Sequence, residues 1–223
     1  MSESCAVHQL SPENSAFTQL TGIAAYQTAV AQLLTPDSAP QASLGVVCLP
    51  SFDREWSLLI HMDSPTKFTA VLREPSDQIW QSFPEAEPKV TTTEASLPAA
   101  MARGAIEHVS DALTGVGYQS PMRSGTDGVT YHLFARQDGR LMAGSAWSPN
   151  PDTKIGHLVG IADTLRAYVA SPASREAASV QFKQHTDWLT ASPAPRDQAP
   201  KLEQIKQHVT KLVANHKKGV LTD

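Results

Sequence analysis

Residues 125–149, GTDGVTYHLFARQDGRLMAGSAWSP, decide the fold because they predict one complete β-hairpin. Asp138-Gly139 separates two runs of alternating apolar and polar residues, and this dipeptide is the strongest short-range signal for a two-residue hairpin turn. Such a turn fixes the register of the two strands. It pairs Gln137 with Arg140, Phe134 with Ala143, His132 with Ser145, and Thr130 with Trp147.

The register divides the hairpin into two faces. The more apolar face is expected to lie in the core, and it carries Val129, Tyr131, Leu133, Ala135, Met142, Gly144 and Ala146. The other face mixes aromatic and polar groups, which suits contact with a partner or with a second layer of the protein. The candidate binding residues of the hairpin are His132, Phe134, Trp147, Arg136 and Ser145. Trp147 also suits an anchor between the sheet and the following helix.

Composition limits the classes of function. The chain has 223 residues, a length that favours one main domain. Its net charge of −4 and its pI near 6.0 provide no positive field that would attract nucleic acid or an anionic membrane. Its mean hydropathy of −0.25 is that of an ordinary soluble protein. The first residues lack a basic segment followed by an apolar one, and no run is long enough for a membrane span, so we expect a cytoplasmic location.

The segments before the hairpin predict a helix followed by strands. Apolar residues at helical spacing predict a helix from Ser11 to Leu34, which ends at the prolines of residues 35–40. Strands are then expected at 44–49, 56–62 and 67–73, the last two forming a hairpin through the polar loop 63–66, and an edge strand at 89–93. Apolar groups on both faces of these strands indicate a sheet covered on both sides.

Further helices surround the hairpin. One begins after Ser96-Leu97-Pro98 and stops at Gly115, and another is expected to have Asp152 as its N-cap and an apolar stripe from Ile155 to Val169. A third spans 174–189. The order of strands, helix, hairpin and helices predicts an α+β fold, with an antiparallel sheet of hairpins packed against helices.

The C-terminal region is predicted to be an appendage. A proline-rich linker at 191–200 leads to a short amphipathic helix from Lys201 to Asn215, too short to be stable alone. It would dock on its own domain or on a second copy of the chain, giving a homodimer. The domain organisation is therefore 1–42 for the N-terminal helix and linker, 43–190 for the α+β core, and 191–223 for the linker and C-terminal helix.

Catalytic motifs give weak signals. Asp127, His132 and Ser145 allow a Ser/His/Asp arrangement to be drawn, but Ser145 lies mid-strand without the sharp turn and oxyanion donors that a serine nucleophile needs. A metal site from distant residues such as His132, His157 and Asp127 lacks the spacing that aligns ligands on one element. Cys48 is interpreted as a small buried hydrophobe. We therefore predict no catalytic residue, no metal and no cofactor.

Three segments carry a resemblance to other proteins. Gly125 through His132, Ala146 through Pro149, and Leu158 through Tyr168 resemble a pattern in bacterial proteins of unknown function. The resemblance implies a bacterial origin and brings no site residues with it. By analogy of class, small acidic bacterial proteins without a catalytic signature include immunity proteins that neutralise toxins. The hypothesis is a non-enzymatic protein that binds another protein, and the alternative is a hydrolase or metal enzyme using His132 with distant partners.

Overall fold

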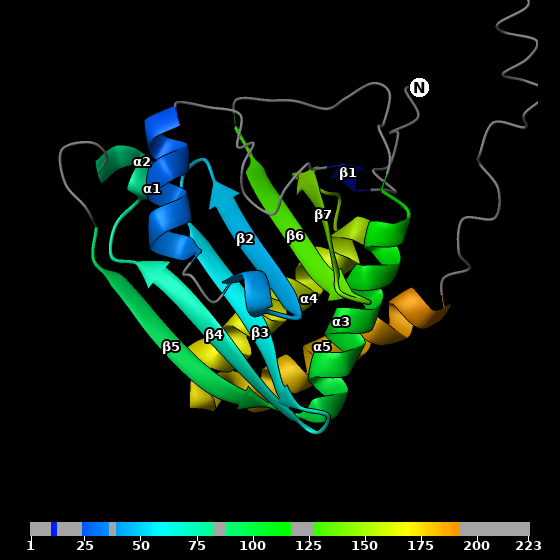
Figure 1. Ribbon diagram of the computed structural model, residues 1–223. Coiled ribbons are helices and arrows are strands. Elements are labelled where there is room, and N and C mark those ends of the chain that lie inside the picture. The colour runs from blue at the N-terminus through cyan, green and yellow to red at the C-terminus, as the bar shows by residue number, and fades with distance from the viewer. Residues whose placement is uncertain (1–9, 13–23, 36–38, 83–87, 117–126, 192–223) are drawn as a thin grey trace, which may run out of the picture. The chain divides into compact units, whose positions relative to one another are not determined.

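The computed structural model describes residues 10–12, 24–35, 39–82, 88–116 and 127–191. These residues form an antiparallel sheet with helices on both faces, so the predicted α+β fold is confirmed (Figure 1). Contacts divide the chain into two units, Met1–Leu189 and Thr190–Asp223. Of the predicted linker and C-terminal helix, 191–223, Ala191 is instead the last residue of a helix, and residues 192–223 lie outside the described residues.

Within the described residues, the sheet of the first unit has seven strands in the order β1-β7-β6-β2-β3-β4-β5, and every neighbouring pair is antiparallel. Their bounds are β1 Ser11–Pro12, β2 Leu44–Pro50, β3 Trp56–Ser64, β4 Lys67–Pro75, β5 Val90–Leu97, β6 Val129–Gln137 and β7 Arg140–Trp147. The predicted strands are all present and slightly longer than expected. The run beginning at Lys89 does form the edge strand, β5.

The register of the β6–β7 hairpin is confirmed at every predicted pair, including His132 with Ser145 and Thr130 with Trp147. Asp138 has a φ of 51° and Gly139 a φ of 76°. A type I′ turn needs positive φ at both central residues, and aspartate followed by glycine adopts this conformation at low cost. The local chemistry of the turn thus determines which side chains share a face.

The helices are α1 Ala24–Leu34, α2 Ile79–Ser82, α3 Ala99–Thr114, α4 Lys154–Ala170 and α5 Arg175–Ala191, with short 3₁₀ helices η1 Ala39–Gln41 and η2 Pro172–Ser174. Two predicted helix starts are wrong. Ser11 and Pro12 pair with β7 because a proline without an N–H is tolerated at a sheet edge. The N-cap of α4 is Thr153, whose hydroxyl accepts a hydrogen bond from the Gly156 amide at 3.1 Å, and not Asp152.

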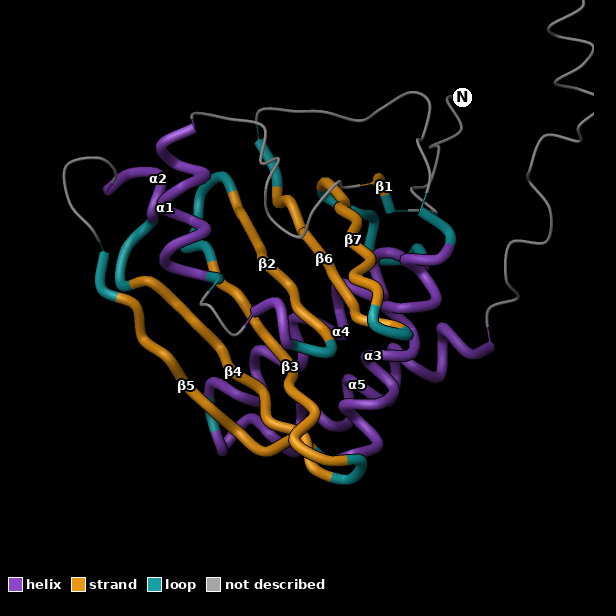
Figure 2. The backbone as a smooth tube through the Cα atoms, in the orientation of Figure 1, coloured by secondary structure: helices purple, strands orange, loops and turns teal. Residues whose placement is uncertain are grey.

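Helices α3 and α4 cover the face of the sheet that carries Leu133 and Ala135, as Figure 2 shows behind the strands. Helix α4 packs on this face mainly against β4 and β5. Helix α3 packs mainly against β6 and β7. Both helices present apolar side chains at helical spacing to one continuous core, so they share the face.

The opposite face is covered by α1 and η1, which lie in front of the sheet in Figure 1. Val47, the partner of His132, packs with Val30 and Leu34 of α1, while Phe134 packs with Ala39 and Ala42. The aromatic and polar face of the hairpin is therefore covered by a second layer of the same chain.

Candidate functional site

The five candidate residues of the hairpin do not form one exposed surface. His132 and Phe134 are 6% and 1% exposed, beneath the α1 and η1 layer. Ser145 and Trp147 are half-buried, and only Arg136 is exposed, near the turn and far along the strands from Trp147. A binding role for these residues as a set would require the covering layer to move.

The residues of the alternative catalytic arrangement are not brought together either. His132 lies on the α1 side of the sheet, whereas His157 belongs to α4 on the other side. Asp127 is exposed at the entry to β6. Within the described ranges, no group of three or more histidine, cysteine, aspartate or glutamate side chains is arranged to hold a metal ion.

A row of chemically active side chains instead crosses the α4 face of the sheet, where β2 ends and β3 begins. Cys48 is paired with Tyr131 on one side and with Trp56 on the other. Glu74 follows Arg73, the strand partner of Ser57, and so lies across from Trp56. The rings of Trp56 and Tyr131 meet edge to face, with centroids 6.4 Å apart. Sheet pairing alone therefore assembles a thiol, a phenol, an indole and a carboxylate.

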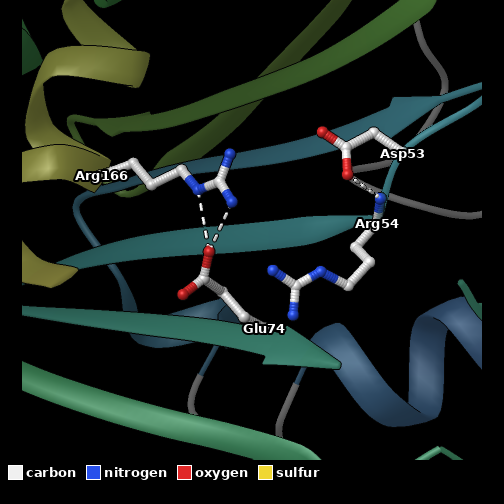
Figure 3. Close-up of polar contacts among 4 residues, drawn as sticks. All are labelled: Asp53, Arg54, Glu74 and Arg166. Atoms are coloured by element: carbon white, nitrogen blue, oxygen red, sulfur yellow. Dashed lines mark hydrogen bonds and ion pairs between the residues drawn. The ribbon is translucent and has the colours of Figure 1, made fainter. Parts of the chain in front are cut away.

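Arg166 of α4 contacts this row of side chains from the helix that covers this face of the sheet. Its Nε and Nη2 atoms both donate to Oε1 of Glu74, at 2.9 and 2.5 Å, and its guanidinium lies 5.1 Å from the centroid of the Trp56 ring (Figure 3). The ion pair and the cation–π contact fix Arg166 between helix and sheet. Figure 3 also shows Arg54 extending from the β2–β3 loop toward Glu74. In the described part of the chain, no carboxylate lies within ion-pair distance of Arg54.

The pKa values of these side chains argue against Cys48 as a nucleophile. Burial raises the pKa of the Cys48 thiol to about 12, and the charge of Asp163 raises it further. Burial likewise raises the pKa of Tyr131, and the charges of Cys48 and Asp163 raise it further. Partial desolvation raises the pKa of Asp163 to about 6, against the opposing effects of Arg166 and Tyr131. At neutral pH the thiol is protonated, and only the thiolate is a good nucleophile.

Glu55, at the start of β3, organises the neighbouring end of the molecule. It is 1% exposed, and its carboxylate accepts hydrogen bonds from the Tyr26 hydroxyl at 2.9 Å and from the amides of Ile79 and Trp80 at 2.8 and 3.2 Å. A carboxylate that receives two amides at a helix start caps that helix. The Tyr26 and Trp80 rings meet edge to face at 5.2 Å, so α1 and α2 are held together.

Two exposed aromatic side chains lie at this end of the sheet. Phe52, in the β2–β3 loop, is 77% exposed, and Trp80 on α2 is 52% exposed. Glu55, three residues after Phe52, binds the amide of Trp80, which places the loop beside α2. We call Phe52, Arg54 and Trp80 the loop–helix surface. This surface is not among the residues predicted from the sequence, although a large aromatic in a polar turn and a tryptophan between Pro75 and Pro84 are signals of it.

An open groove lies at the opposite end of the sheet. Its volume is about 650 Å³, and Met62, Phe68, Arg103, Glu107 and Arg136 are among its lining residues. The groove forms at the end of the sheet where β2 begins, at Leu44. The neighbouring strands β3 and β6 extend past this residue on either side of β2. Its walls carry both signs of charge, which give no preference for a ligand of one sign.

No protein-family model, curated protein or solved structure matches this chain. In the described ranges, the helices are too short or too polar to cross a membrane.

Proposed function

We propose that this is a non-enzymatic protein that binds another protein through the loop–helix surface, Phe52, Arg54 and Trp80. The observation that carries the proposal is the pair of exposed aromatic side chains at one end of the sheet. Exposing a large aromatic ring to water has a cost, which contact with a partner removes. Tryptophan and arginine are also among the residue types that dominate the energy of protein interfaces.

The surface is suited to binding because its backbone is held in place. Glu55 fixes the start of α2, and Tyr26 supports the Trp80 ring from the side. A side chain that is ordered before binding loses less conformational entropy on contact. Arg54, two residues after Phe52 in the same loop, is exposed and extends toward Glu74 (Figure 3). The matching partner offers an apolar pocket for the two rings.

No specific observation favours the enzyme alternative. His132 is buried beneath the α1 layer and lies apart from the Tyr131–Asp163 pair on the opposite face of the sheet. We further propose that the protein acts in the cytoplasm. A toxin-neutralising immunity protein belongs to the proposed class, and its toxin would then be the partner. A homodimer through residues 201–215 stays a proposal, tested by comparing the sedimentation mass of the whole chain with that of residues 1–191.

The test is affinity purification from the native host with quantitative mass spectrometry, comparing three tagged chains. The wild type is compared with a Phe52→Ser/Trp80→Ser variant and with a matched Met62→Ser/Leu141→Ser control that removes exposed apolar groups elsewhere. We expect one partner to be retained by the wild type and the control and lost at least tenfold by the Phe52/Trp80 variant. Equal recovery by all three chains would refute the assignment to this surface.

A further inference from the structure

Two histidines meet at the contact between α4 and α5. Nδ1 of His157 and Nδ1 of His185 lie 3.0 Å apart, so one ring donates a hydrogen bond and the other accepts it. Trp188 of α5 stacks on the His157 ring with centroids 3.9 Å apart. The His185 ring lies so close to Gly160 that a Cβ there would be 2.3 Å from it. Glycine at this position allows the ring to rest on the backbone of α4.

The rest of α5 holds the helix only weakly. Of its 17 residues, Ala178 and Phe182 are the buried ones, and Leu189 packs partly against the core. Phe182 lies over Gly104 of α3, with its ring 3.5 Å from the position that a Cβ on this glycine would occupy. A helix with so little buried apolar area has a low free energy of local opening. The histidine pair is therefore a substantial part of what docks α5.

We propose that His157 and His185 form a pH-sensitive latch that docks α5 on α4 and releases it when both imidazoles are protonated. In the neutral pair, one Nδ1 carries a proton and the other offers a lone pair. When both rings are protonated, two N–H groups and two positive charges face each other across 3.0 Å. The hydrogen bond is then lost and replaced by repulsion, which opposes docking.

The charges around the pair are consistent with this behaviour. Burial lowers the pKa of both histidines, and the charge of His185 lowers that of His157 further, while Asp152 acts in the opposite direction. A lowered pKa means that the docked state binds fewer protons than the open state. Docking is therefore fully supported above the ordinary histidine pKa and weakens as the pH falls through and below it.

Two of the charged side chains on the helices around the histidine pair, Lys154 and Lys183, are held in ion pairs. Lys154 of α4 pairs with Asp111 of α3 at 2.8 Å, and Lys183 pairs with Asp187 on α5 at 2.5 Å. On α3, Glu107 and His108 follow Gly104 by three and four residues, so they lie on the helix face that includes this glycine. Asp152 remains the charge that acts directly on His157. Release of α5 would expose Phe182 and the α3 surface around Gly104.

The test measures hydrogen-exchange protection factors of residues 175–191 in the full chain at about pH 7.5 and about pH 5.5, corrected for intrinsic exchange rates. We expect protection of α5 to fall roughly fivefold or more at the lower pH while that of β3 is unchanged. His185→Asn places an amide that cannot gain a proton at the position of Nδ1, and we expect it to abolish the pH dependence. His61→Asn, on β3, serves as the control and should behave as the wild type.

Two results would overturn the proposal. One is equal protection of α5 at both pH values in the wild type, and the other is the same pH dependence in His185→Asn as in the wild type. A second measurement needs no variant: an NMR titration of the imidazole nitrogens in the wild type should show coupled titration of His157 and His185 below the ordinary histidine range. Independent titration of both rings at the ordinary histidine value would also overturn it.

Discussion

The hydroxyl of Tyr131 on β6 interacts with the carboxyl of Asp163 on α4, one turn before Arg166. The Asp163 carboxylate carries a charge that the folded state disfavours. The pKa of Asp163 is raised from 3.8 to about 6, with desolvation as the largest cause. The helix is therefore held at this point by a contact whose strength depends on pH.

We predict that Asp163→Asn stabilises the protein at neutral pH. Because the folded-state pKa is raised, the contribution of Asp163 to stability is full below pH 3.8 and is lost as the pH rises through about 6. Asparagine keeps an oxygen for Tyr131 and never ionises. Asp163 lies at the exposed edge of α4, so solvent screening reduces the gain to about 1 kcal/mol. Urea unfolding of the wild type and the variant at neutral pH and near pH 4 measures this gain in the free energy of unfolding. An equal gain at both pH values would contradict the raised pKa of Asp163.

We predict that Arg166→Met lowers the free energy of unfolding by about 1 kcal/mol, because it leaves the half-buried Glu74 without its partner while methionine still covers Trp56. Glu74→Gln alone should have a similar effect. The double variant should lose less than the sum of the two, which a double-mutant cycle from denaturant unfolding measures. Strict additivity would show that the ion pair contributes nothing.

We predict that Glu55→Ala is severely destabilising, by about 3 kcal/mol, since it leaves the Tyr26 hydroxyl and two amides of α2 without their acceptor in a buried position. Glu55→Gln retains an acceptor oxygen and should lose about half as much. Urea unfolding gives both values. An alanine variant as stable as the wild type would exclude Glu55 as the residue that holds α2.

Two glycines facing α5 provide a matched pair of substitutions. Gly160→Ala would place a Cβ 2.3 Å from the His185 ring, whereas Gly104→Ala would place one 3.5 Å from Phe182. Alanine favours helix by about 1 kcal/mol over glycine. Gly104→Ala should therefore gain stability, and Gly160→Ala should reduce the hydrogen-exchange protection of α5 because His185 must move. Equal protection of α5 in the two variants would contradict the close approach of His185 to α4.

The hairpin was predictable in detail because the Asp138-Gly139 turn and the alternation next to it are local. The burial of His132 and Phe134 was not predictable, because it depends on α1 and η1, about one hundred residues earlier in the chain, folding over that face. The row from Tyr131 to Glu74 depends on the order of strands in the sheet, which local patterns do not encode. The N-cap of α4 differed by one residue because threonine and aspartate are both good caps.

The proposed function is tested most directly by site-specific photo-crosslinking in the native host. A photoreactive phenylalanine analogue is placed, one position at a time, at Phe52, Trp80, Leu141 or Val180, all of which are exposed. The account predicts that positions 52 and 80 give a crosslink to the same protein and that positions 141 and 180 do not. Absence of a product at 52 and 80, or a crosslink to the same partner at 141 or 180 alone, would contradict binding through the loop–helix surface.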